Sequence, residues 1–251
     1  MGNNAANDIA DFTRLFTNYN VLESRYWKQR VVGEQQEFED FKERFVVFDT
    51  RMQALLKKET PFYNIFDILN VRHRETKLHT PFLIHLLNPK ASHEQDSLFL
   101  NTFLTEVLHL PFTYEELSQF EIHEELSTLE GRLDIIMTFK LKGVKKSIVI
   151  ENKIYAGDQD KQLDRYYNYL RHDLKLADSD LWLVYLTPRA TPPSSKSIKP
   201  ADAQKLSQNK RLLLIGYHQH IIPWLAESWQ HIASVRVQQT VFQYIKTLEN
   251  L

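Results

Sequence analysis

The stretch KSIVIENKI, Lys146 to Ile154, decides the fold. Its three consecutive branched apolar residues are typical of a strand that is buried on both faces. The strand runs directly into Glu151, Asn152 and Lys153, so a segment suited to burial ends in two opposite charges. Because side chains alternate along a strand, Glu151 and Lys153 share one face and Asn152 lies on the other.

The segments around this strand predict a mixed α/β fold. A second strand, GRLDIIMTF at 131–139, precedes it, and the turn KLKGVKK at 140–146 pairs the two as a hairpin. An amphipathic helix follows at 160–176, and further strands are predicted at 180–187 and 211–216. With helices before and after them, these strands form a mixed β-sheet with helices on its faces.

Two helical stretches and one long loop complete the main part of the chain. Residues 74–89 and 96–110 have helical patterns, separated by a break near Asn88 and Pro89 because proline cannot continue a helix. The stretch PRATPPSSKSIKPADAQ at 188–204 is rich in Pro and Ser and predicts an irregular loop.

The sequence predicts helix in the N-terminal region, residues 1–60. Apolar residues from Phe38 to Leu55 recur every three or four positions and form one stripe, which Thr60 and Pro61 end. We expect residues 1–60 to form a helical segment packed on the core of the chain. A dimerising coiled coil is the alternative use of this stripe, so a homodimer stays open.

Composition excludes several classes of protein. The chain has 251 residues, 43% hydrophobic and 25% charged, as ordinary globular proteins do. The lack of cysteine excludes disulfides and thiolate metal sites and favours the cytoplasm. No stretch approaches the roughly 20 apolar residues of a membrane span, so we expect no membrane partner. The formal net charge of -1 argues against a uniformly basic coat for nucleic acid but allows a local positive groove.

A candidate metal site follows from the hairpin. If the two strands pair as predicted, Asp134 lies beside Glu151 and Lys153. Carboxylate oxygens, together with the backbone carbonyl of Asn152, are the ligands that Mg²⁺ prefers. Lys153 would orient a water or stabilise developing negative charge. The alternative is a purely structural ion pair at the end of a strand.

The next helix makes the pattern specific. Gln162 and Tyr166 are four residues apart and share one helix face. The chain resembles the PD-(D/E)XK nuclease superfamily in a series of motif residues: Asp134, Glu151, Asn152, Lys153, Gln162 and Tyr166. The Gln-x-x-x-Tyr helix is typical of its RecB-like branch, and residues 74–104 resemble the N-terminal part of a bacterial subgroup. Leu133 stands where the motif has proline, a position without metal chemistry.

The resemblance implies a restriction-endonuclease-like α/β fold, with residues 61–251 as the nuclease-like domain. It implies that Asp134 and Glu151 hold Mg²⁺ or Mn²⁺ and that Lys153 is the catalytic lysine. The implied activity is the metal-dependent hydrolysis of phosphodiester bonds in nucleic acid, with DNA as the expected partner.

The resemblance also gives roles to residues on two helices. Gln162 and Tyr166 would orient Lys153 or a substrate phosphate. Glu75 would reach the metal, often through water, and a solvated charge is its alternative. A nuclease-fold DNA-binding or assembly module with weak or no cleavage is the alternative function. The complete set of two acids, lysine and glutamine favours the enzyme over that alternative.

Overall fold

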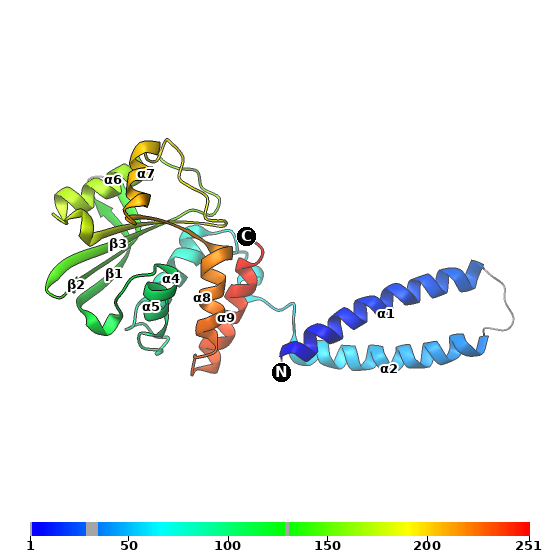
Figure 1. The fold of residues 1–251 in the computed structure, drawn as a ribbon. Coiled ribbons are helices and arrows are strands. Elements are labelled where there is room, and N and C mark those ends of the chain that lie inside the picture. Colours follow the sequence, from blue (N-terminus) through cyan, green and yellow to red (C-terminus); the bar gives the residue numbers. More distant parts are fainter. Residues whose placement is uncertain (1, 29–34, 129–130) are drawn as a thin grey trace. The chain divides into compact units, whose positions relative to one another are not determined.

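The computed structural model describes residues 2–28, 35–128 and 131–251. The chain divides into two compact units, Met1–Tyr63 and Asn64–Leu251 (Figure 1). No helix in these ranges has the length and apolar character needed to span a bilayer.

The first unit is built from two helices, α1 (Gly2–Lys28) and α2 (Gln35–Glu59). Their apolar sides meet through aromatic rings, and the centroids of Phe12 and Phe48 lie 5.4 Å apart. The helix predicted from the apolar stripe is therefore confirmed, and it ends directly before Thr60. The side chain of Phe38, the first residue of the stripe, lies outside the described part. The packing of residues 1–60 on the core stays a prediction.

The second unit holds one five-stranded mixed sheet in the order β1-β2-β3-β4-β5. The strands are β1 (Leu117–Thr128), β2 (Gly131–Leu141), β3 (Val144–Asn152), β4 (Leu181–Thr187) and β5 (Leu212–Gly216). The first three strands are antiparallel to one another, whereas β3, β4 and β5 run parallel. The central strand β3 is buried from Ser147 to Asn152. The predicted α/β fold of the restriction-endonuclease type is confirmed.

Helices cover both faces of the sheet. Figure 1 shows α6 and α7 on one face and α4, α5, α8 and α9 on the other, and an apolar cluster fills the space under each layer. The helices are α3 (Ile65–Ile68), α4 (Thr80–Leu87), α5 (Leu98–Thr102), α6 (Gln162–Asn168), α7 (Pro200–Gln208), α8 (Ile222–Trp229) and α9 (Val235–Leu248). Four π-helical segments are η1 (Glu75–His79), η2 (Phe103–Val107), η4 (Tyr169–Asp173) and η6 (Tyr217–Ile221). Two 3₁₀ turns in the described ranges are η3 (Tyr114–Glu116) and η5 (Asp178–Asp180).

Two elements differ from the sequence prediction. Strand β1 was not predicted; it lies at the edge of the sheet, its apolar residues are interrupted by charged ones, and its pairing with β2 is irregular between Ser118 and Glu121. The second is α7, which occupies part of the predicted irregular loop 188–204. It begins at Pro200, and proline is favoured at the first position of a helix because it needs no hydrogen-bond acceptor there.

Gly216, the last residue of β5, allows a close approach that any side chain would prevent. A Cβ atom built there would lie 2.8 Å from the backbone nitrogen of Ala190 and would overlap the side chain of Gln219. We predict that Gly216→Ala lowers the free energy of unfolding by about 1–3 kcal/mol, because the backbone at Ala190 must shift. Urea unfolding measures this change. Gly157→Ala is the control, since a Cβ there meets no atom within 4 Å, and equal loss in both variants would contradict the prediction.

Candidate active site

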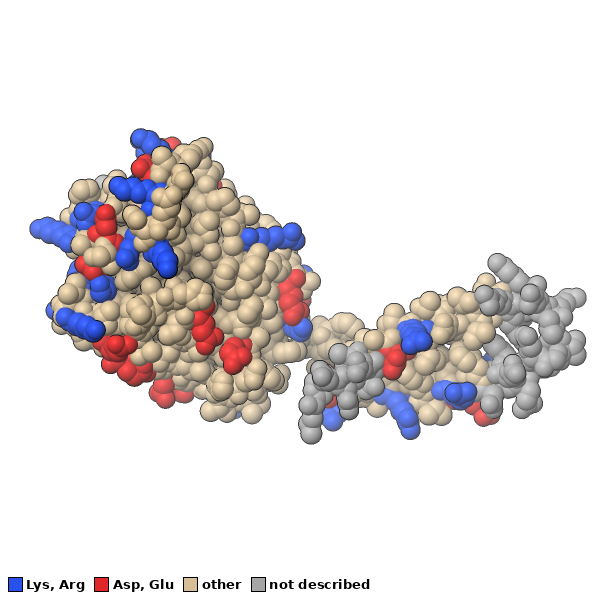
Figure 2. All heavy atoms as spheres, viewed as in Figure 1, with Lys and Arg blue, Asp and Glu red and all other residues tan. Residues whose placement is uncertain are grey.

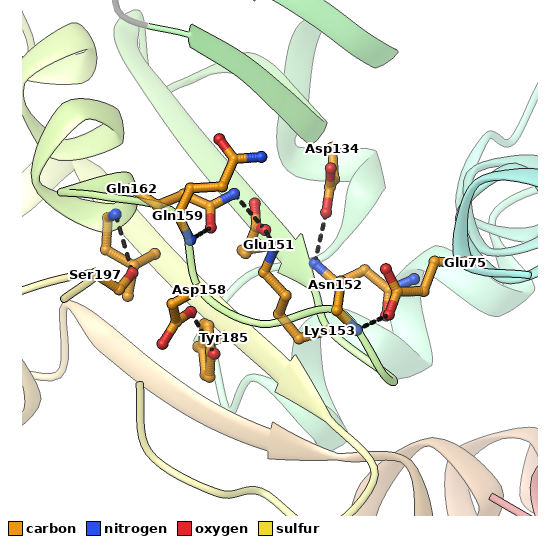
Figure 3. A network of polar contacts seen from close by, with 12 residues as sticks. Glu75, Asp134, Glu151, Asn152, Lys153, Asp158, Gln159, Gln162, Tyr185 and Ser197 are labelled. Atoms are coloured by element: carbon orange, nitrogen blue, oxygen red, sulfur yellow. Dashed lines mark hydrogen bonds and ion pairs between the residues drawn. The ribbon is translucent and has the colours of Figure 1, made fainter. Parts of the chain in front are cut away.

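The end of β3 divides its charged and polar side chains between the two faces of the sheet (Figure 3). On one face, Lys153 Nζ lies 2.8 Å from Glu151 Oε1, and both side chains are buried. On the other face, Asn152 Nδ2 donates to Thr80 Oγ1 (3.1 Å). The hydroxyl of Tyr217 donates to Asn152 Oδ1 (2.9 Å). The structure thus places Glu151 and Lys153 together, as strand alternation predicts.

Asp134 reaches the same end of the sheet from β2. Ile135 pairs with Ile150, so the register puts Asp134 opposite Glu151. Asp134 Oδ2 accepts the backbone N–H of Asn152 at 2.9 Å, as Figure 3 shows. Since the N–H and C=O of one strand residue point to the same side, the carbonyl of Asn152 is also directed toward Asp134.

Helix α6 brings Gln162 and Tyr166 to the carboxylate of Glu151. Gln162 Nε2 donates to Glu151 Oε1 (2.7 Å) and to the hydroxyl of Tyr166 (3.0 Å). The hydroxyl of Tyr166 donates in turn to the backbone carbonyl of Arg132 (2.6 Å). Gln162 and Tyr166 are only 2% and 1% exposed. The helix face that carries both residues therefore looks at the strand and not into solvent.

The two oxygens of Glu151 have different surroundings. Oε1 is bound by Lys153 and Gln162, whereas Oε2 is buried and has no hydrogen-bond partner among the described residues. Burial and the nearby charge of Asp134 raise the pKa of Glu151 to about 7. Burial also raises the pKa of Asp134. Although burial opposes it, the charge of Glu151 raises the pKa of Lys153, so its ammonium group stays protonated.

Glu75, at the start of η1, contacts the loop that follows β3. Its Oε1 accepts three backbone N–H groups, from Ile154 (2.6 Å), Tyr155 (2.7 Å) and Ala156 (3.1 Å). Successive amides that converge on one oxygen form a favourable site for an anionic group. Glu75 therefore holds the loop directly after Lys153, and its Oε1 is committed to that loop. The expected role of Glu75 at a metal stays a prediction.

Comparison with protein families agrees with this geometry. A family model described as the PD-(D/E)XK nuclease superfamily matches residues 63–246. The chain belongs to the PD-(D/E)XK nuclease superfamily. No curated protein and no solved structure matches the chain. The matched range contains every site residue predicted from the sequence, and members of this superfamily are generally nucleases that use divalent metals.

The donor groups at the end of β3 fit the divalent metal that the superfamily implies. Glu151 Oε2 is a buried carboxylate oxygen without a partner in the described chain. Asp134 lies opposite Glu151 on β2, and the carbonyl of Asn152 points to the same side of β3 as the N–H that Asp134 accepts. All three are oxygen donors, the kind that Mg²⁺ and Mn²⁺ prefer. The described residues hold no group of three or more His, Cys, Asp or Glu side chains arranged for a metal. A cation here would therefore take its remaining ligands from backbone or water.

Three residues that hold the loops around the candidate active site were not predicted from the sequence: Asp158, Tyr185 and Ser194. The hydroxyl of Tyr185 donates to Asp158 Oδ1 and the backbone N–H of Ser194 donates to Oδ2, both at 2.7 Å. Asp158 thus ties the loop after β3 to the loop after β4. No local pattern marks Asp158 in the sequence, and the pairing of Tyr185 with Glu151 depends on a sheet register that only the fold reveals.

His79 is a packed ring and not a free ligand. Its Nε2 is 2.7 Å from the backbone carbonyl of Arg72, which can only accept, so Nε2 carries the proton. Nδ1 then accepts from the hydroxyl of Tyr244 at 3.0 Å. The side chain is fully buried, and burial lowers the pKa of His79 to about 4.

We predict that His79 makes the fold sensitive to acid. In the unfolded chain its pKa is about 6.5, so between that pH and about 4 the unfolded state binds one more proton than the folded state. The free energy of unfolding therefore falls as the pH drops through this window, by about 3 kcal/mol from His79. Urea unfolding at several pH values, for the wild type and His79→Gln, measures this contribution.

Glu151 acts in the opposite direction, because its folded pKa of about 7 lies above the unfolded value. Its contribution is present in both proteins and cancels in their difference. The wild type should therefore lose more stability than His79→Gln between pH 7 and 4. Parallel pH curves for the two proteins would contradict the prediction.

Proposed function

We propose that the protein is a metal-dependent nuclease that hydrolyses DNA phosphodiester bonds with Mg²⁺ or Mn²⁺. The observation that carries this proposal is the buried Glu151 Oε2 without a partner in the described chain. A second carboxylate, Asp134, lies opposite Glu151 on the neighbouring strand, while an ammonium group occupies the other oxygen of Glu151. One buried and one half-buried carboxylate beside one ammonium leave an excess of negative charge that a divalent cation neutralises.

The residues of the chain divide the work in this proposal. Asp134, Glu151 and the carbonyl of Asn152 would hold the cation, which when bound supplies charge neutralisation and an activated water. Lys153 keeps its proton and sits at the same carboxylate, where it stabilises negative charge that develops on a phosphate. Gln162 binds Glu151 Oε1 and so leaves Oε2 as the oxygen that would hold the cation.

Finer assignments are part of the same proposal. The hydrogen bond between Gln162 and Glu151 supports a place in the RecB-like branch, because it gives the Gln-x-x-x-Tyr helix a function at the site. The bacterial subgroup rests on the resemblance of residues 74–104. DNA as substrate and the cytoplasm as location stay predictions, as does a homodimer.

One observation favours the alternative, a nuclease-fold DNA-binding or assembly module. Glu75 Oε1 binds three amides of the loop after β3, so this oxygen is not directed at the carboxylate pair. A module without cleavage would retain such a contact as loop structure. Metal binding and cleavage by variants of Glu151 and Lys153 separate the two functions.

We predict that Glu151→Gln and Lys153→Ala fail in different ways. Glu151→Gln keeps the shape of the side chain but removes its charge, so Mn²⁺ affinity should fall by at least about 10- to 100-fold and cleavage with it. Lys153→Ala should retain or tighten Mn²⁺ binding, because a positive neighbour is lost, while cleavage falls on the order of 100- to 1,000-fold. Calorimetric Mn²⁺ titration and cleavage of linear and circular DNA give both readouts.

Glu106→Gln is the matched control, because it makes the same change at an exposed position. Thermal melts establish that each variant is folded. Wild-type protein that binds no Mn²⁺ and cuts no DNA, with all variants indistinguishable from it, would favour the binding module.

A further inference from the structure

A cavity of about 690 Å³ lies near the turn between β2 and β3, at the end of these strands remote from Glu151. Its wall includes Lys90 from the segment after α4, Lys140 from β2 and Lys145 from β3. Glu121 is the one carboxylate among the described residues that line it. The fold therefore brings three lysines from separate parts of the chain to the wall of one hollow.

These three lysines have no acidic partner in the described part of the chain. The next residue along β3 is different, because Lys146 Nζ is 2.5 Å from Asp180 Oδ1. Glu121 lies 3.5 Å from the ring of His123. On the face of Asn64–Leu251 that Figure 2 shows, basic and acidic side chains are mixed in the upper part, and acidic ones predominate in the lower part. The cavity is thus a local excess of positive charge on a chain whose formal net charge is -1.

Two of the lysines oppose each other directly across the hairpin. The register of β2 and β3 pairs Lys140 with Lys145. Like charges directly opposite on neighbouring strands destabilise a sheet, and no carboxylate compensates this pair within the described chain. A polyanion bound in the cavity would remove the repulsion, because its oxygens can lie between the two ammonium groups.

The same register connects the lysines to the candidate active site. Lys145 precedes Glu151 by six residues on β3, and Lys140 follows Asp134 by six residues on β2. An even spacing keeps each lysine on the strand face of its carboxylate. At about 3.3 Å per residue, six residues span roughly 20 Å. Duplex DNA rises 3.4 Å per base pair, so this length corresponds to about six base pairs.

We propose that Lys90, Lys140 and Lys145 form a second binding site for DNA, which holds backbone phosphates about six base pairs from the phosphodiester that is cut. The proposal rests on the proposed function. Contacts of this kind act on phosphate and not on bases, so the site adds affinity and register without sequence preference.

The experiment compares a long and a short substrate with the full chain. The triple variant Lys90→Gln/Lys140→Gln/Lys145→Gln should bind a 20-base-pair duplex about 10-fold or more weakly, measured by fluorescence anisotropy with Ca²⁺ in place of Mg²⁺. The slope of log K against log salt should shrink by about 2 to 3, because up to three phosphate contacts are lost. Cleavage of a stem-loop with a five-base-pair stem, too short to reach the lysines, should be unchanged.

A matched control separates this site from a general effect of charge. Lys57→Gln/Lys175→Gln/Lys205→Gln removes the same three charges from exposed lysines elsewhere, and it should leave the affinity for the long duplex near that of the wild type. The melting temperature should not fall in Lys140→Gln, because the change relieves the repulsion with Lys145.

The outcomes distinguish this inference from the function on which it rests. If the wild type cuts both substrates and the two triple variants bind the long duplex equally well, the second site is wrong and the nuclease stands. Equal weakening in both triple variants also overturns the second site, because the effect is then only the net charge. If the wild type neither binds nor cuts DNA, both proposals fail.

Discussion

The buried carboxylate of Glu151 is the group on which the rest of the site depends. Moving an ionised carboxylate out of water is costly unless hydrogen bonds and an opposite charge compensate it. Here Lys153 and Gln162 bind one oxygen, and these two contacts fix both the end of β3 and the start of α6. The second oxygen has no such compensation in the described chain, and the proposed metal site rests on that imbalance.

The residue between Glu151 and Lys153 joins the two layers of the domain. The side chain of Asn152 is bound by Thr80 of α4 and by Tyr217, which lie on the face opposite to Glu151. A displacement of the helices on that face would therefore reach the carboxylate through the backbone of β3. Within the Glu-x-Lys motif, hydrogen bonds to the opposite layer thus fix the side chain of the middle residue, and an ion pair fixes the outer two.

Local periodicity in the sequence was enough to predict the centre of this arrangement. Strand alternation placed Glu151 and Lys153 on one face, and the four-residue spacing of Gln162 and Tyr166 placed both on the helix face that meets them. Each of these predictions needs only the geometry of one element. The hairpin pairing that brings Asp134 to Glu151 was also readable, because the turn between the strands is short.

What the sequence did not reveal depends on contacts between distant segments. Glu75 and the loop after β3 are about 80 positions apart, and no pattern within either segment indicates that they meet. Asp158 and Tyr185 meet only because β3 and β4 pair in parallel. Strand β1 was missed for a local reason, since an edge strand with charged residues among apolar ones has a weak signal.

Asp134 also holds the end of β3, which bears on the choice of a variant for crystallising the protein with nucleic acid. On the β2 side, its carboxylate, and not a backbone carbonyl, receives the N–H of Asn152. Truncation to alanine would leave this amide without an acceptor as well as removing a charge from the site. Asparagine retains an oxygen at the same place, so it separates loss of charge from loss of the strand end. A variant at this position should therefore carry asparagine, because a structure with alanine would show an altered strand end as well as the loss of the charge.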